Sequence, residues 1–128
     1  YGMTGIFPWT SKMLEKRKAI GYREVVAADD CPFLEKAQKI RGHEFHYSKV
    51  IKKAQKKGMR FSFKIKRGQG IMDKNDGLCY KNVLATFTHL HALGSPEWAD
   101  GLIKQAIFYR TKKQSVLKKK SHRIIGRK

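Results

Sequence analysis

The sequence predicts an α/β domain that is rich in β-strands and carries one helix toward its C-terminus. The segment "RFSFKIKR" (60–67) alternates apolar and polar residues, which is typical of a half-buried strand. The run "LCYKNVLATFTHLHAL" (78–93) is β-branched and aromatic, and it is long enough for one long strand and its exit. Ser95 and Pro96 then have the residue types of a helix N-cap and a first helical position. These elements fit one domain, because 128 residues suffice for a single core.

The first half of the chain contains further strand candidates and one helix candidate. "TGIFPW" (4–9) reads as the end of a strand, and "SKMLEKRKAI" (11–20) permits a short helix that ends before Gly21. "GYREVVAA" (21–28) and "HEFHYSKVI" (43–51) are both predicted to be strands, because turn-prone residues bound them.

The alternation in residues 60–67 assigns its side chains to two faces of the predicted strand. One face is apolar and the other is polar: Phe61, Phe63 and Ile65 against Ser62, Lys64 and Lys66. We expect the apolar face to lie in the core and the polar face to meet solvent.

The helix expected after Ser95 carries an apolar stripe, by which it would pack on the sheet. The stripe consists of Trp98, Leu102, Ile103, Ala106, Ile107 and Tyr109. From Thr111 onward this periodicity is lost and Lys and Arg dominate. Residues 111–128 are therefore predicted to be a disordered basic tail, and the domain would end near residue 110.

The net charge suggests one class of partner. Twenty-nine Lys and Arg against ten Asp and Glu leave a formal charge of +19, which favours binding to phosphate backbones through counterion release. A basic RNA- or DNA-binding protein of ribosomal type is therefore one hypothesis. However, 41% hydrophobic and 11% aromatic residues are too many for a wholly disordered basic chain. We expect the charge to decorate a folded core.

The two cysteines and the chain start indicate the cellular setting. Cys31 and Cys79 lie far apart and form no CxxC pair, which argues against a zinc finger or disulfide framework and suits the reducing cytoplasm. Neither resembles a catalytic nucleophile, because Cys31 sits in an acidic turn and Cys79 in a predicted strand. The start "YGMTGIFPWT" lacks the basic n-region and the apolar h-region of a signal peptide, and no apolar run approaches the ~20 residues of a membrane span. Its first residue is Tyr, as expected for a fragment, although processing or trimming gives the same start.

The stretch "RGHEFHYS" (41–48) is dense in groups that handle protons. His43 and His46 are three residues apart, so on a strand they point to opposite faces and cannot chelate one ion together. The spacing is not that of an HExxH zinc motif either, and no metal site is predicted. A polar outer face of a strand would explain part of the pattern. The addition of Glu44 and Tyr47 exceeds what solvation needs and favours a functional segment.

His89 and His91 form a second candidate site at the end of the long apolar run. They are two residues apart, so on a strand they share a face. Ligands of open α/β sheets gather beyond the carboxyl ends of strands, and histidine suits a general base there. A buried pair that is hydrogen-bonded to the backbone is equally compatible with this spacing.

Four blocks together resemble, in order and spacing, the C-terminal glutaminase domain of the cobyrinate a,c-diamide synthase family. They are "GIFP", "GYREV", "RGHEFHYS" and "GIMDKNDGLCYKNVLATFTHLHALGSPEWA", and the likeness covers roughly residues 1–106. The resemblance implies that residues 1–110 are the second half of a class I glutamine amidotransferase-like three-layer α/β domain. Related enzymes that amidate cobyrinate elsewhere on the ring, nickel-sirohydrochlorin or siroheme share the pattern, so the tetrapyrrole stays open.

The resemblance also implies a reaction. An ATP- and magnesium-binding N-terminal domain would phosphorylate a ring carboxylate, and ammonia released from glutamine would attack the acyl phosphate. In the family, a cysteine in a Cys-Gly-Gly elbow attacks glutamine and a histidine moves its proton. His89 matches that histidine, and Glu44, His46, Tyr47 and His91 are expected near the glutamine. This chain itself is expected to bind no cofactor.

The chain departs from the family pattern in two respects. The nucleophile elbow lies upstream of "GIFP" in the family, and the chain has neither a substitute for it nor a GxxxxGK[ST] phosphate loop. We therefore expect the last part of a longer ligase, or one subunit of a split ligase, that is inactive alone. The charge of +19 and the basic tail are also unusual for this family. They keep nucleic-acid binding as the alternative function, or as a non-specific contact made by the tail.

Overall fold

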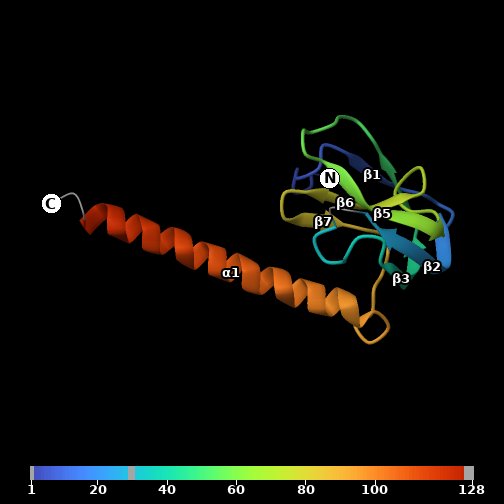
Figure 1. Ribbon diagram of the computed structural model, residues 1–128. Helices are drawn as coiled ribbons and strands as arrows, with labels where there is room; N and C mark the ends of the chain where they lie inside the picture. The colour runs from blue at the N-terminus through green and yellow to red at the C-terminus, as the bar shows by residue number, and fades with distance from the viewer. Residues whose placement is uncertain (1, 29–30, 126–128) are drawn as a thin grey trace.

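The computed structural model describes residues 2–28 and 31–125, and side chains as far as residue 115. Seven strands precede one long helix (Figure 1). Their bounds are β1 (Thr10–Met13), β2 (Ala19–Ala27), β3 (Lys39–His46), β4 (Ser48–Ile51), β5 (Arg60–Arg67), β6 (Asn75–Tyr80), β7 (Val83–Ala85) and α1 (Pro96–Ile125). The predicted combination of a strand-rich domain with a helix toward the C-terminus is therefore present.

The strands form two antiparallel sheets. β1 pairs with β4, and the other five strands lie in the order β3-β2-β5-β6-β7. β3 and β7 are the two edges of the larger sheet, yet the chain that leaves β7 returns to β3 through a bridge between His43 and His89. The larger sheet is therefore curled, and its two edges meet at His89.

The core lies between β2 and β5 and the loops that cover them. It consists of Val25, Ala27, Leu34, Ile40, Phe63 and Ile65. The apolar face predicted for residues 60–67 is confirmed at Phe63 and Ile65, which are buried. The predicted solvent face is wrong at Ser62, which is fully buried and donates a hydrogen bond to the Cys79 sulfur at 3.1 Å. Ser62 and Phe63 point to opposite faces of β5 and both are fully buried, so the start of this strand is covered on both faces.

The predicted helix at residues 11–20 is wrong, because this segment forms β1 and the start of β2. β1 pairs with β4 in the register Thr10↔Ile51 to Met13↔Ser48. All four β1 residues are exposed, so no apolar helix face was available to outweigh this backbone pairing. Residues 43–51, predicted as one strand, are divided between β3 and β4, which belong to different sheets.

The run predicted as one long strand, residues 78–93, is instead a hairpin followed by an extended segment. Lys81 has a positive φ of 51°, and the turn pairs Tyr80 with Val83. Beyond Ala85 the chain leaves the ladder and rejoins the sheet only at the bridge of His89 with His43. The sequence predicted His89 at the end of a central strand, and this is wrong. His89 lies instead where the two edges of the larger sheet meet.

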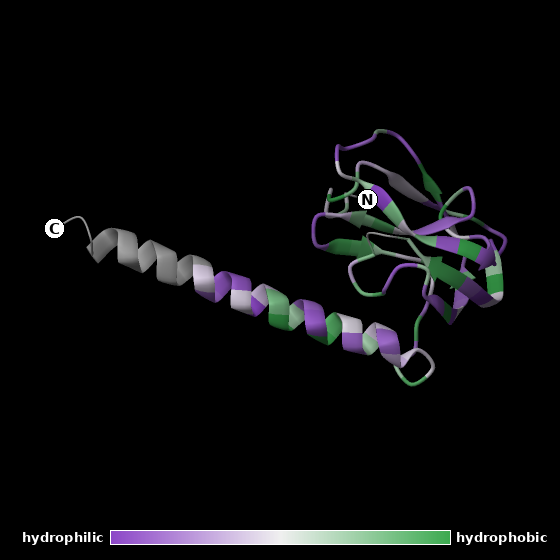
Figure 2. Cartoon of the chain, viewed as in Figure 1, coloured by the Kyte–Doolittle hydropathy of each residue, from purple (hydrophilic) through white to green (hydrophobic). Residues whose placement is uncertain are grey.

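The helix α1 begins at Pro96 as predicted, but most of its apolar stripe does not pack on the sheet. Trp98 packs against the core, and a Cβ at Gly101 would overlap the carbonyl oxygen of Phe33. Farther along, the helix leads away from both sheets (Figure 1), and Ile107 is 60% exposed. Figure 2 shows hydrophobic residues on this projecting part of the helix.

Ser95 was expected to be the N-cap of α1, and the residues from Thr111 onward were expected to form a disordered basic tail. The Ser95 hydroxyl donates to the carbonyl oxygen of Arg41 at 3.1 Å, which ties the helix start to β3. The backbone is helical from Thr111 to Ile125, and the disorder expected for residues 111–128 stays a prediction. Residues 126–128 of that predicted tail lie outside the described part. Over the residues that are described, no helix is both long and apolar enough to cross a membrane.

Candidate functional site at the His89 cleft

A cleft of about 650 Å³ opens where the two edges of the curled sheet meet. Its walls come from β2, β3, the end of β5 and the segment that follows β7. They are lined by Tyr22, Arg23, Glu24, Arg41, Gly42, His43, Arg67, His89, His91 and Gly94. Three arginines and three histidines face one glutamate in this lining, so the cleft favours an anionic or carboxylate-bearing ligand.

His89 lies on the cleft wall with an exposed side chain, and the backbone around it is held firmly. Its N–H donates to the carbonyl oxygen of His43 at 2.8 Å, and the His43 N–H donates to the His89 carbonyl oxygen at 3.0 Å. The two rings lie with centroids 6.1 Å apart, and the Tyr22 ring lies 6.0 Å from that of His43. An accessible imidazole on a fixed backbone is suited to proton transfer.

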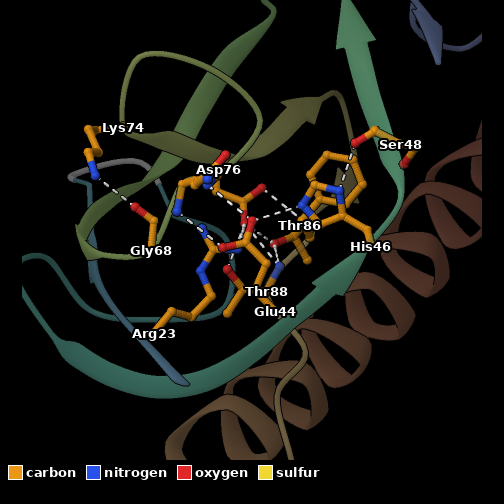
Figure 3. A network of polar contacts seen from close by, with 12 residues as sticks. Arg23, Glu44, His46, Ser48, Gly68, Lys74, Asp76, Thr86 and Thr88 are labelled. Carbon is orange, nitrogen blue, oxygen red and sulfur yellow. Dashed lines mark hydrogen bonds and ion pairs between the residues drawn. The ribbon is translucent and has the colours of Figure 1, made fainter. Parts of the chain in front are cut away.

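The segment that leads from β7 to His89 is held by one buried carboxylate, that of Asp76 in β6 (Figure 3). Asp76 Oδ1 accepts a hydrogen bond from the Phe87 N–H at 3.1 Å. Its Oδ2 accepts from the Thr88 N–H at 3.0 Å and from the hydroxyls of Thr86 and Thr88 at 2.8 and 2.6 Å. The side chain of Asp76 is 0% exposed, so these donors replace the water that an ionised carboxylate would otherwise need.

Arg23 of β2 connects Asp76 to a second buried carboxylate. Its Nη1 lies 3.3 Å from Asp76 Oδ2 and 3.1 Å from Glu44 Oε1, and its side chain is 0% exposed. One cation between two carboxylates leaves one negative charge, which the backbone and hydroxyl donors around the two acids help to disperse. The three residues are therefore energetically coupled, and loss of Arg23 would leave two buried carboxylates without a cation between them.

Glu44 of β3 is enclosed by protein partners. It accepts hydrogen bonds from the N–H groups of Gln69 and Gly70 at 3.1 and 3.2 Å, and His46 Nε2 lies 2.9 Å from its Oε1. Burial acts to raise the pKa of Glu44, but the bonds from His46 and the two amides, with the charge of Arg23, outweigh burial and hold the pKa below its ordinary value. Glu44 is thus a carboxylate in the folded protein at neutral pH.

His46 lies behind the cleft and supports Glu44. Its Nδ1 lies 2.7 Å from the carbonyl oxygen of Ser48. Its ring stacks on Phe87 with centroids 3.8 Å apart and an interplanar angle of 6°. His46 therefore contacts the segment before His89 without being part of the cleft lining.

The structure places the five predicted site residues in three different positions. His89 and His91 both line the cleft, and His91 Nδ1 accepts a hydrogen bond from the Leu93 N–H at 3.3 Å. Glu44 and His46 belong to the buried network, and Tyr47 is a partly exposed residue that contacts Phe45 outside the cleft lining. Substrate contact by Glu44, His46 and Tyr47 stays a prediction.

Sequence reasoning missed the residues that organise the site. Asp76, Arg23, Thr86 and Thr88 were not singled out, although all four lie in the blocks that carry the family resemblance. A usable indication was the position of Asp76 two residues before the apolar pair Leu78 and Cys79, because a charged side chain in an apolar strand is rarely buried without a partner. Within the described residues, no group of three or more His, Cys, Asp or Glu side chains is arranged to hold a metal ion.

Comparison with known proteins identifies the family. Residues 1–97 match the family model of the CobB/CobQ-like glutamine amidotransferase domain. The chain belongs to this family. The match ends at the start of α1, so most of the projecting helix lies beyond it.

Curated relatives agree with this assignment. The chain is 36% identical over 102 residues to a cobyrinate a,c-diamide synthase of Magnetococcus marinus, covering 80% of this chain and 21% of the relative. It is 36% identical over 104 residues to the enzyme of that name from Methanothermobacter thermautotrophicus, covering 81% and 23%. For the Saccharolobus solfataricus relative of the same name, the identity is 41% over 91 residues, covering 71% and 20%. The chain thus spans about a fifth of the length of these relatives. No solved structure matches it significantly.

Proposed function

We propose that this chain forms part of an ATP- and glutamine-dependent ligase that amidates the a and c carboxylates of a tetrapyrrole, with cobyrinate in cobalamin biosynthesis as the first candidate. The chain would belong to the half that releases ammonia from glutamine, within a class I amidotransferase-like three-layer domain. The observation that carries the proposal is the position of His89. It is an exposed imidazole, held on a doubly hydrogen-bonded backbone, at the wall of a basic cleft.

In this proposal His89 moves one proton in each half of glutamine hydrolysis. It accepts the proton of a cysteine thiol as the sulfur attacks the glutamine carboxamide, and it returns that proton to the departing ammonia. The cysteine comes from a part of the enzyme outside these 128 residues. In this proposal His91 and the arginines of the cleft lining bind the carboxylate of the glutamine, and their presence in that lining supports this role.

The remaining substrates bind elsewhere in this proposal. ATP and magnesium are held by a partner domain or subunit, where a ring carboxylate is phosphorylated and then receives the ammonia. The chain contains no GxxxxGK[ST] phosphate loop, which supports a site outside it. The reaction would take place in the cytoplasm, and glutamine and the tetrapyrrole carboxylate are the ligands of the assembled enzyme.

The central experiment is His89→Ala in a complete enzyme, assembled from this chain and a partner part that carries the cysteine and the ATP site. Glutamine-supported amidation should be lost, whereas amidation supported by free ammonia should be retained, because the ATP site is unchanged. His91→Ala is the matched variant, two residues away in the same cleft lining. Full glutamine-dependent activity of His89→Ala would refute the assignment, and loss in His91→Ala alone would move the base to His91.

A second experiment uses the 128-residue chain alone. It should release no ammonia from glutamine, because a general base without a thiol nucleophile forms no acyl-enzyme. Release that persisted after replacement of both Cys31 and Cys79 by Ser would contradict the proposed chemistry. Release that depended on Cys31 would make this residue the nucleophile.

Nucleic-acid binding is the second candidate function, and the observation in its favour is the projecting helix. Lys104, Arg110, Lys112 and Lys113 are all exposed on it. Salt-dependent binding to RNA or DNA that survives deletion of residues 111–128 would support this function. Loss of binding on that deletion would reduce it to a property of the helix end.

A further inference from the structure

We infer that Asp76 is the positioning residue for His89, and that the Thr88 hydroxyl is the contact through which it acts. The inference rests on the proposed role of His89 as the base. Asp76 is not among the residues that line the cleft, and its side chain is 0% exposed, so it would act only through the segment that carries His89.

The first step concerns residues 86–88, which lie between the end of β7 and the bridge at His89. These residues pair with no strand, so their N–H groups need other acceptors. The Asp76 carboxylate accepts hydrogen bonds from the N–H groups of Phe87 and Thr88 and from the hydroxyls of Thr86 and Thr88. One carboxylate therefore replaces the sheet ladder for the residues directly before His89.

The second step concerns the opposite side of the same segment, where β3 approaches closely. A Cβ at Gly42 would lie 2.7 Å from the His89 carbonyl oxygen and 2.8 Å from Thr88 Cγ2. The segment is thus confined between the Asp76 carboxylate and the backbone of β3. Movement of His89 away from β3 breaks its two bonds to His43, and movement toward β3 is blocked.

The third step explains why this confinement bears on chemistry. Within the described residues, no side chain holds the His89 ring by a hydrogen bond, unlike His46, whose two ring nitrogens both have partners. A catalytic histidine is commonly oriented by a third group that bonds its second nitrogen. In this protein the backbone of His89 sets the position of the ring. The contacts of Thr88 with Asp76 hold that backbone in place, and they therefore do part of what a third group does elsewhere.

The Arg23 contact extends this arrangement to a loop that is distant in sequence. Arg23 joins Asp76 to Glu44, and Glu44 accepts from the backbone of Gln69 and Gly70. Gly68, in the same loop, packs beside Arg23, where a Cβ would come within 3.1 Å of its side chain. The position of Asp76 is therefore fixed by the charge network as well as by β6.

The test compares Thr88→Val with Thr88→Ser. The first keeps the shape but removes the hydroxyl that donates to Asp76, and the second keeps the hydroxyl but removes the methyl that packs at Gly42. In the complete enzyme, kcat for glutamine-supported amidation should fall about tenfold in Thr88→Val, because a hydrogen bond to a charged group is lost. The KM for glutamine and the ammonia-supported rate should change less than about twofold, because neither Thr88 nor Asp76 lies in the cleft lining.

Hydrogen exchange of the 128-residue chain supplies the structural readout. The amides of His43 and His89 should exchange about tenfold faster in Thr88→Val than in Thr88→Ser, whereas the amides of β2 should be unaffected. Equal effects of the two variants on kcat and exchange, or no effect of either, would overturn the inference. The proposed function fails separately, through full glutamine-dependent activity of His89→Ala.

Discussion

Residues of the same type are buried in the curled sheet and exposed on the projecting helix. Ile65 in β5 is 6% exposed, whereas Ile107 in α1 is 60% exposed. The sheet also buries charges, since Arg23, Glu44 and Asp76 are all within it, whereas the charges of the helix face solvent. The comparison shows that apolar content does not decide burial in this chain. Burial follows from closure of the sheet on itself, in which the helix beyond its first turns has no part.

The largest expected effect tests the buried charges. Asp76→Asn should lower the free energy of unfolding by about 3 kcal/mol or more, because an amide group cannot accept all the hydrogen bonds that two N–H groups and two hydroxyls donate to the buried carboxylate. Urea unfolding of the 128-residue chain measures it. Asp73→Asn is the matched control, since Asp73 is exposed and its positive φ of 49° suits asparagine. If the two variants were equally stable, the buried network would not hold the sheet.

A pair of isoleucine variants tests the comparison directly. Ile65→Ala should cost roughly 2–5 kcal/mol, because it opens a cavity in the core. Ile107→Ala should change the free energy of unfolding by no more than about 0.5 kcal/mol. Both are read from the same urea transitions. A large loss in Ile107→Ala would mean that the exposed face of α1 is covered in solution, and the two regions would no longer differ as described.

Gly42→Ala tests the contact that closes the sheet. We expect a loss of about 1–3 kcal/mol, because the new methyl group would be forced against His89 and Thr88. Gly94→Ala serves as its control, since a Cβ there meets only the His91 carbonyl oxygen at an ordinary 3.6 Å. Thermal unfolding followed by circular dichroism separates the two variants. A neutral Gly42→Ala would show that the segment of residues 88–90 can move away from β3 at little cost.

The smallest effect concerns the pH dependence of stability. The pKa of Glu44 is lower in the folded protein than in the unfolded chain, where it is about 4.3. The Glu44 carboxylate therefore contributes its full stabilisation above the unfolded-state pKa, and this contribution is lost as the pH falls through the folded-state pKa. Below about pH 4.5, the stability of Glu44→Gln should therefore fall less steeply than that of the unaltered chain.

Unfolding midpoints measured from pH 7 to pH 3 test this dependence, with the exposed Glu35→Gln as control. Parallel acid profiles for the unaltered chain and Glu44→Gln would contradict the contribution that we assign to the Glu44 carboxylate.

The predictions from sequence succeeded where neighbouring residues suffice. The strand at residues 60–67, the strand at 21–28 and the helix start at Pro96 were all found, because alternation and capping chemistry are local properties. They failed at residues 11–20 and 78–93, where pairing with distant strands overrides local preference. The apolar residues of α1 do recur with helical periodicity, but periodicity does not show whether another part of the chain packs against them.

The sequence by itself determined the family, the local strand and helix patterns and the histidine pair at positions 89 and 91, because these depend on residue types at fixed short spacings. Only the tertiary structure decided which groups surround His89. Asp76 lies 13 positions before it, Gly42 lies 47 before it and Arg23 lies 66 before it. Whether such residues meet depends on the register and closure of the sheet. A buried carboxylate becomes a fixed anchor only when a cation and several donors converge on it, and no local pattern records that convergence.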